Sequence, residues 1–330
     1  MDLVTGGTGI VGAHVLLELV RAGRSARAIH RDGSGPAHVQ RLFAHYGAEA
    51  LFTKIEWVKA DLLDVHGLSE AMQGVEHVYH AAAHISFDPR ERKKLFAVNI
   101  TGTAHVVNAA LEAGVKRLVH VSSTSAVGAG PAGVPRTEDT PWDEDGEHSA
   151  YAVSKREAEL EVHRGIAEGL DAVMANPCVV LGPGQPQRSS MSLMERLQRG
   201  TAWYPSGRAS TVDARDVAQA LLLLAEHGES GARYLLVGEQ VPYRDLFTQV
   251  LQAFGHPAPT REVRPWMLQL AWRVEAVRGL LTGSRRLITR STVSSARSQR
   301  SYDASRSRTL GVTYRPLADT IANTVAWMRR

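Results

Sequence analysis

The sequence has a single cysteine, Cys178, among 330 residues. One cysteine permits no internal disulfide, which excludes a disulfide-stapled secreted protein and fits a reducing compartment. No apolar run approaches the 18 residues of a membrane-spanning helix, and the first β-branched run begins just after Met1. We therefore expect no transmembrane segment, no signal peptide and a cytoplasmic protein.

The composition lies close to the globular average, with 44% apolar and 22% charged side chains. A disordered or collagen-like chain would depart strongly from these values. A chain of this length can bury roughly three quarters of its unfolded surface. A sizeable hydrophobic core is therefore available.

Short β-branched runs alternate with amphipathic stretches along the chain, which predicts a Rossmann-type, doubly wound parallel α/β sheet. The expected strands cover 3–5, 28–30, 55–58, 77–80, 118–121, 172–174 and 233–237, and the expected helices cover 10–20, 68–72, 95–113, 151–166 and 216–225. We expect residues 1–176 and 209–237 to form the dinucleotide-binding domain. Residues 177–208 and 238–330 would form a smaller substrate-binding cap.

A glycine-rich stretch joins the first expected strand to the first expected helix, as Thr5-Gly6-Gly7-Thr8-Gly9-Ile10-Val11-Gly12. Gly6 would allow the tight turn, Gly9 the approach of a diphosphate, and Gly12 close packing of the helix on the strand. A diphosphate would then lie at the helix N-terminus, where free N–H groups and the helix dipole favour negative charge. The pattern and its context predict dinucleotide binding.

The end of the second expected strand bears on the choice of cofactor. An NAD site places a carboxylate there for the ribose 2′-hydroxyl, whereas an arginine accommodates the 2′-phosphate of NADP. The chain has Arg31 at this place, followed by Asp32. We favour NADP(H), with NAD(H) as the alternative.

Tyr151 and Lys155 stand four residues apart in an expected helix, so both side chains would lie on one face. A phenol with a pKa of about 10 is a poor acid or base at neutral pH. A nearby ammonium stabilises the phenolate and lowers that pKa. The hydroxyls of residues 122–125 end a buried strand, at the sheet edge where such folds bind ligands.

Together these residues resemble the extended short-chain dehydrogenase/reductase superfamily, also described as the NAD-dependent epimerase/dehydratase family. The resemblance covers nearly the whole chain and is strongest to its dihydroflavonol-reductase-like and 3β-hydroxysteroid-dehydrogenase-like branch. It also rests on motifs at 60–62, 80–83, 98–103, 176–177, 182–184, 212–218, 302–306 and 310–317.

The resemblance implies roles for individual residues. Tyr151 would transfer the hydroxyl proton, and Lys155 would lower its pKa and bind the nicotinamide ribose. Ser123, with Thr124 as the alternative, would hold the substrate carbonyl oxygen, and Asn99 would support Lys155 through a water. The cofactor would contact Gly6, Thr8, Gly9, Ile10, Val11, Gly12, Arg31, Asp61, Leu62, Ala81, Ala82, Ala83, Val121, Tyr151, Lys155, Pro177 and Val180.

The residues on the substrate side are defined less sharply. The resemblance places His84, Phe87, Ser125 and Asn176 there, although the family often has arginine in place of Asn176. Cys178 has no partner at nucleophile–base spacing, so we interpret it as a small buried hydrophobe. We expect no metal. A mostly apolar helix opening at 266–272 suits a lid over a hydrophobic substrate, an interfacial helix or ordinary core packing.

Three functions remain open. The leading one is an NADPH-dependent carbonyl reductase, or the reverse alcohol dehydrogenase, acting on a small and fairly hydrophobic molecule. The second is a nucleotide-sugar epimerase or dehydratase with tightly bound NAD. Arg31 and the absence of an Asp-Glu pair at 122–125 count against this second function. The third is a dinucleotide-sensing protein without catalysis, which usually lacks the Tyr/Lys pair.

The charge is distributed unevenly. Residues 261–330 hold 14 arginines and 4 acids, a net charge of +10, so the first 260 residues sum to −6. Such a segment can bind nucleic acid or anionic membrane, but its motifs indicate a folded cap. We expect no nucleic-acid partner and consider an acidic loop or peripheral contact with a membrane as the candidate contacts. The protein would be a monomer or a homodimer.

Overall fold

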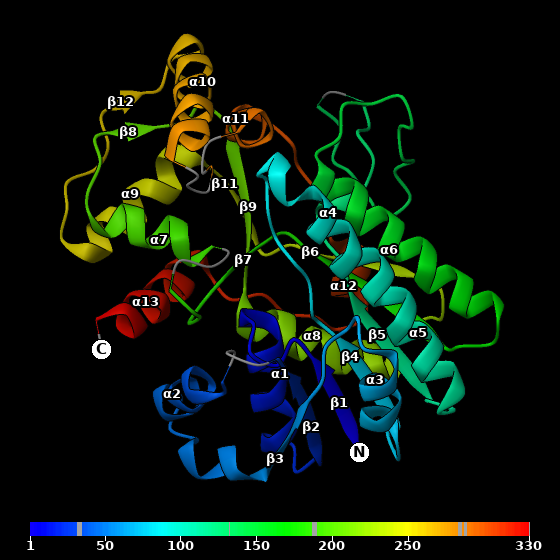
Figure 1. The fold of residues 1–330 in the computed structure, drawn as a ribbon. Coiled ribbons are helices and arrows are strands. Elements are labelled where there is room, and N and C mark those ends of the chain that lie inside the picture. The colour runs from blue at the N-terminus through cyan, green and yellow to red at the C-terminus, as the bar shows by residue number, and fades with distance from the viewer. Residues whose placement is uncertain (32–34, 132, 187–189, 283–285, 287–288, 330) are drawn as a thin grey trace.

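The structure is a computed structural model that describes residues 1–31, 35–131, 133–186, 190–282, 286 and 289–329 (Figure 1). Its centre is a parallel sheet of seven strands in the order β3-β2-β1-β4-β5-β6-β10. The strands are β1 (Asp2–Thr5), β2 (Ala26–His30), β3 (Ile55–Lys59), β4 (His77–His80), β5 (Arg117–Val121), β6 (Ala172–Pro177) and β10 (Arg233–Leu236). The predicted Rossmann-type fold class is confirmed.

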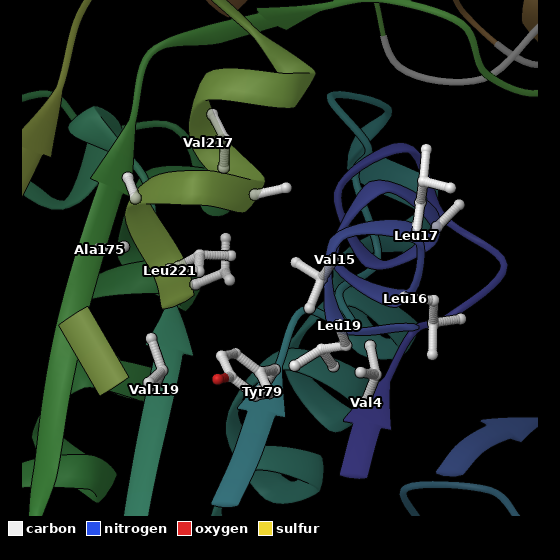
Figure 2. Packing of buried hydrophobic residues seen from close by; sticks show 14 of the residues in the cluster. Val4, Val15, Leu16, Leu17, Leu19, Tyr79, Val119, Ala175, Val217 and Leu221 are labelled. Atoms are coloured by element: carbon white, nitrogen blue, oxygen red, sulfur yellow. The ribbon is translucent and has the colours of Figure 1, made fainter. Parts of the chain in front are cut away.

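Helices cover both faces of this sheet, because successive strand residues point to opposite sides and both sides are apolar. Val4 joins a core with α1 and α8 on one face, while its neighbour Leu3 joins a core with α3 and α5 on the other. Figure 2 shows Tyr79 and Leu221 in the first of these cores. The flanking helices are α1 (Ile10–Arg21), α2 (Ala37–His45), α3 (Val65–Met72), α5 (Gly102–Glu112), α6 (Ala150–Ala167) and α8 (Ala214–His227).

A smaller assembly stands beside the carboxyl ends of the large sheet (Figure 1). Its three-stranded sheet has the order β11-β9-β7, and β8 pairs with β12. Its strands are β7 (Val179–Leu181), β8 (Trp203–Tyr204), β9 (Arg208–Asp213), β11 (Glu239–Pro242) and β12 (Arg261–Glu262). Its helices are α7 (Met191–Gln198), α9 (Tyr243–Phe254), α10 (Pro265–Thr282), α11 (Arg290–Arg297) and α13 (Leu317–Met328). The short helix α12 (Ser305–Thr309) packs instead against β10 of the large sheet, where the Ser307 hydroxyl donates to the Leu235 carbonyl at 2.8 Å. The boundary between nucleotide-binding and substrate-binding parts stays a prediction.

One expected helix is not continuous. The stretch predicted as a helix over 95–113 divides into α4 (Arg92–Phe96), a π-helical turn η3 (Ala97–Thr101) and α5. Apolar periodicity cannot reveal such a turn. A π-helical turn adds one residue to a helix, and the apolar residues before and after it still repeat with helical spacing. π-helical turns are frequent at functional sites, and this one carries Asn99.

The basic C-terminal segment is folded against an acidic connection. Residues 126–150 link β5 to α6, and the backbone N–H of Arg136 in this connection donates to the Ser301 carbonyl at 2.9 Å. Arg306 pairs with Asp139 at 2.7 Å and Arg290 with Glu147 at 3.0 Å. The expected contact between the basic segment and an acidic loop is therefore present. Within the described ranges, no helix combines the length and the apolar character needed to cross a bilayer.

Candidate active site

The order of the strands reverses between β1 and β4, and the glycine turn lies at the carboxyl end of β1. Gly6 has a φ of +68°, and a Cβ there would lie 2.6 Å from the Cα of Ala82, after β4. A Cβ on Gly12 would lie 2.2 Å from the Gly6 carbonyl oxygen. Only glycine fits both positions. The turn leads directly into α1. The N-cap residue of this helix is Gly9, which has no side chain that could accept a hydrogen bond from the first N–H groups of the helix.

The ends of β2 and β3 border a hollow of about 540 Å³, lined by Arg31, Lys59, Ala60, Asp61 and Asp64. The Arg31 guanidinium lies 4.0 Å from the Asp61 carboxylate, and both side chains are about half exposed. Lys59 is a second cation here that sequence reasoning missed; it directly follows the strand expected over 55–58 and is the last residue of β3. Asp32 lies outside the described residues. The hollow therefore brings two cations, Arg31 and Lys59, and two carboxylates, Asp61 and Asp64, to the place predicted for the 2′ position of the adenine ribose.

Tyr151 is placed opposite the end of β5 by the first turn of α6. Ser149 caps this helix, because its hydroxyl accepts from the N–H of Ala152 at 3.1 Å. Burial raises the pKa of Tyr151, and a hydrogen bond with the Ser123 side chain opposes that rise. Ser123 also accepts from the N–H of Ser125 at 3.1 Å. The structure thus joins Ser123 to the phenol.

Lys155 lies one turn further along α6 and is almost fully buried, with 2% of its surface exposed. Its ammonium donates to the carbonyl of Val121, the last residue of β5, at 2.8 Å. Burial lowers the pKa of Lys155 to about 8, and the charge of Glu159 acts in the opposite direction. An amine that titrates near physiological pH is typical of functional sites.

Asn99 connects the substrate side to α6. Its side-chain oxygen accepts from the N–H of His84 at 2.7 Å, while its amide donates to the His84 carbonyl and to the Ser154 hydroxyl, both at 3.0 Å. The predicted support of Lys155 through a water is not tested by these contacts. They fix the backbone of His84 beside the helix that carries Tyr151 and Lys155.

Sequence reasoning missed a role for His80, at the end of β4. Its Nδ1 atom lies 2.7 Å from the hydroxyl oxygen of Thr5, and its Nε2 atom lies 3.0 Å from the hydroxyl oxygen of Thr103. Because Thr103 donates to the Asn99 carbonyl at 2.6 Å, it accepts from Nε2–H, and Nδ1 accepts from Thr5. Burial lowers the pKa of His80 to about 3. A neutral histidine thus links the glycine turn to the π-helical turn.

A buried carboxylate behind the site was also missed. Glu159 is fully buried one turn beyond Lys155, and one of its oxygens accepts from the Asn176 amide. That amide also donates to the Ser123 carbonyl at 3.1 Å. Arg233 lies 3.6 Å from the other Glu159 oxygen. Burial raises the pKa of Glu159, while the positive charge of Arg233 and the hydrogen bond from Asn176 act against that rise. Asn176 therefore lies behind Ser123, in contact with the carboxylate.

The other predicted residues lie around the same edge of the sheet. The ring of Phe87 meets the ring of Tyr151 edge-on at 5.7 Å between centroids. Leu62 is buried against the start of α5. Burial raises the pKa of the Cys178 thiol, which disfavours a thiolate nucleophile. The remaining positions are Thr8, Ile10 and Val11 before and in the first turn of α1, Ala81 and Ala83 after β4, and Pro177 and Val180 in β6 and β7.

Comparison with known proteins agrees with this geometry. The model of the NAD dependent epimerase/dehydratase family matches residues 3–238. A dihydroflavonol-4-reductase-like protein of Synechocystis sp. is 31% identical over 334 residues, covering 99% of this chain and 94% of that protein. Cinnamoyl-CoA reductase 1 of Oryza sativa is 32% identical over 271 residues, covering 78% and 77% of the two chains.

Solved structures share the fold over the full chain. The crystal structure of gox2253 has a TM-score of 0.83 and 29% identity, covering 100% of this chain and 98% of that one. The dTDP-glucose 4,6-dehydratase DesIV from Streptomyces venezuelae, solved with NAD and TYD, has a TM-score of 0.75 and 22% identity, covering 99% and 97%.

The family model and the named reductases among the relatives place the chain among the oxidoreductases of a family that depends on a nicotinamide dinucleotide. The chain belongs to the NAD dependent epimerase/dehydratase family, within the extended short-chain dehydrogenase/reductase superfamily and beside its dihydroflavonol-reductase-like members.

Proposed function

We propose that the chain is an NADP(H)-dependent oxidoreductase that reduces the ketone or aldehyde of a small, fairly hydrophobic substrate, or oxidises the corresponding alcohol. The observation that carries this proposal is the convergence of Ser123, Tyr151 and Lys155 where β5 meets α6. The named reductases among the relatives support it. The glycine turn at the N-terminus of α1 provides the matching diphosphate site.

The bound cofactor supplies the hydride that adds to the carbonyl carbon. Ser123 donates a hydrogen bond to the carbonyl oxygen, and Tyr151 donates the proton that converts this oxygen to a hydroxyl. A phenol is protonated at neutral pH, which is the form that reduction requires, and burial raises the pKa of Tyr151 further. Ser123 is preferred to Thr124 because Ser123 hydrogen-bonds the phenol.

Lys155 stabilises the phenolate that remains after proton transfer, because its ammonium lies on the same helical face one turn away. Asn99 holds the backbone of His84 on the substrate side. Phe87 places an apolar ring edge-on against the ring of Tyr151 on the substrate side. Ser125 supports Ser123 through its N–H, and Asn176 does so from behind through the Ser123 carbonyl.

The first test is net consumption of NADPH by the purified chain with a panel of aromatic, alicyclic and long-chain ketones and aldehydes. We expect turnover that depends on the carbonyl compound. Tyr151→Phe should lower kcat by about 10²–10⁴-fold, the usual contribution of a general acid, with little change in NADPH affinity. Tyr243→Phe, in the core around α9, is the matched control and should retain kcat. Equal rates for Tyr151→Phe and the parent would refute the mechanism.

The second test concerns the cofactor. We expect NADPH to bind more tightly than NADH, because a 2′-phosphate would lie beside Arg31 and Lys59. Arg31→Ala should weaken NADPH binding roughly tenfold, the equivalent of one charge-assisted hydrogen bond, and leave NADH binding unchanged. Lys54→Ala, an exposed change just before β3, is the control. NADH binding as tight as NADPH binding in the parent protein would argue for NAD.

The alternative is a nucleotide-sugar epimerase or dehydratase that retains NAD, a class found among the similar folds. Residues 122–125 are Ser-Ser-Thr-Ser and lack the Asp-Glu pair needed for elimination. Protein that purifies with bound NAD and converts nucleotide sugars without net NADPH consumption would favour this alternative. A non-catalytic dinucleotide sensor is disfavoured by the intact Tyr151/Lys155 pair, and would be favoured if Tyr151→Phe kept full biological activity.

A further inference from the structure

The helix α10 exposes an apolar face. Trp266, Leu270, Val274, Val277 and Leu280 are all exposed, although large apolar side chains are normally buried. Their spacing of three or four residues places them on one side of the helix. Figure 1 shows α10 at the edge of the smaller assembly, away from the large sheet. Contiguous apolar surface of this kind marks a site of interaction.

Arginines lie within and beside this apolar face. Arg273 and Arg278 line a hollow together with Val274, Val277 and Thr282. The Arg273 guanidinium lies over the Trp272 ring at 4.7 Å and donates to the Gln269 carbonyl at 2.8 Å. An arginine can bury its aliphatic stem among apolar groups while its charge stays at a polar boundary.

We propose that α10 docks this protein on an anionic lipid surface. The apolar side chains would enter the boundary between headgroups and acyl chains, and the arginines would meet lipid phosphates. Charge complementarity favours this occupant, because α10 holds Arg273 and Arg278 against one acid, Glu275, and belongs to the segment 261–330 with its net charge of +10. The arginines of that segment paired to distant carboxylates, such as Arg290 and Arg306, lie outside α10.

A second copy of the chain is a poorer occupant. A two-fold contact through this face would place Arg273 and Arg278 of both copies in one interface. Like charges brought together in an apolar contact destabilise it. Only Glu275, already bonded to Arg278 at 2.7 Å, offers a carboxylate within α10.

The docked helix would lie next to the mouth of the catalytic site. Asp88 accepts from the N–H of Arg286 at 3.0 Å, and Arg90 donates to the Gly279 carbonyl at 3.1 Å. These bonds attach the end of α10 to residues that directly follow Phe87, whose ring contacts Tyr151. A lipid-soluble ketone could thus pass from the membrane along Phe87 to Tyr151. This last step rests on the proposed function, whereas docking does not.

The test is sedimentation of the full chain with phosphatidylcholine vesicles that contain or lack phosphatidylglycerol, without cofactor or substrate. We expect binding to the anionic vesicles that weakens with salt. The double variant Leu270→Ser/Val274→Ser and the double variant Arg273→Gln/Arg278→Gln should each bind roughly tenfold less tightly or worse. Leu160→Ser, at an exposed leucine of α6, is the matched control and should bind like the parent.

Insertion of α10 into the lipid can be measured separately, by quenching of tryptophan fluorescence. Brominated lipids should quench the fluorescence of the parent and should quench Trp266→Phe less, because Trp266 is the most exposed of the α10 tryptophans. Absence of binding to both kinds of vesicle would overturn the proposal. So would a concentration-dependent dimer that Leu270→Ser/Val274→Ser dissociates, since the face would then bind a second copy.

A kinetic measurement separates delivery from docking. With a long-chain ketone carried in anionic vesicles, Leu270→Ser/Val274→Ser should raise KM and leave kcat unchanged, while a short, water-soluble ketone should show no difference. Docking without ketone reduction would refute the proposed function and keep the membrane assignment. Reduction of both ketones with unchanged KM would overturn the delivery step alone.

Discussion

At the scale of single residues, the charged form of Lys155 lowers the stability of the fold but is the form that the proposed reaction needs. Its ammonium is buried beside one carbonyl acceptor, and burial lowers its pKa to about 8 from a value near 10.4 in unfolded chains. A lysine with a depressed folded pKa destabilises the fold when charged. The full penalty applies below about pH 8 and fades as the pH approaches the unfolded value. The charged form is nevertheless the one that stabilises a phenolate.

This titration predicts a pH profile. In the reductive direction, kcat/KM for NADPH should fall as the pH rises through about 8, because the free enzyme then loses the ammonium of Lys155. Lys155→Met should remove this falling limb together with most of the activity. Lys116→Met, at an exposed lysine paired with Glu76, should leave the profile unchanged. A wild-type profile that stays flat to about pH 10 would contradict the prediction.

At the scale of elements, α6 carries three functional side chains on one stripe. Tyr151, Lys155 and Glu159 are four residues apart, so they follow one another along the face that meets β5 and β6. The first two could be predicted, because an ammonium four residues from a phenol can stabilise the phenolate and so make an acid–base pair. Glu159 could not, since a glutamate in a helix is almost always exposed and its partners Asn176 and Arg233 are distant in sequence.

The same contrast applies to the other elements. Short β-branched runs predicted the strands of the large sheet, and helical patterns predicted most of its helices, because both faces of that sheet are apolar. They did not predict the π-helical turn at Asn99 or the linkage through His80. The His80 linkage depends on hydrogen bonds with Thr5 and Thr103, residues that only the fold brings to this ring. The nine-residue α2 was also missed, because its buried residues span little more than one turn.

The position of Glu159 leads to a prediction for α6. Its raised pKa means that the ionised carboxylate destabilises the fold at pH values above the unfolded pKa of about 4.3. Glu159→Gln should therefore be at least as stable as the parent at neutral pH, with the difference vanishing in acid. Because the charge of Glu159 raises the pKa of Lys155, the same change should move the falling limb of kcat/KM to lower pH.

The control for this prediction is Glu157→Gln, an exposed change on the same helix, which should alter neither stability nor the pH profile. Glu159 acts through Lys155 and is therefore a positioning residue. If Glu159→Gln lowered kcat equally at every pH and left the limb in place, its role would be packing alone.

At the scale of the whole molecule, the helix α13 packs into the apolar core on one face of the large sheet. Trp327, in α13, is 5% exposed and belongs to the same apolar cluster as Val4. Its indole N–H donates to the Gly184 carbonyl at 3.0 Å, and its ring meets His45 at 5.5 Å. The last helix thus ties the start of the chain to the smaller assembly, so the two parts should unfold together.

Replacement of this residue tests that coupling. Trp327→Ala should lower the free energy of unfolding by about 3–5 kcal/mol, the usual cost of truncating a large buried side chain. Urea denaturation followed by circular dichroism should show one transition for parent and variant, with NADPH raising the midpoint. Trp266→Ala, at a 62% exposed tryptophan of α10, removes the same side chain from the surface and should cost under about 1 kcal/mol. Two separate transitions in the parent would mean that α13 does not couple the parts, and that Trp327 stabilises only its own neighbourhood.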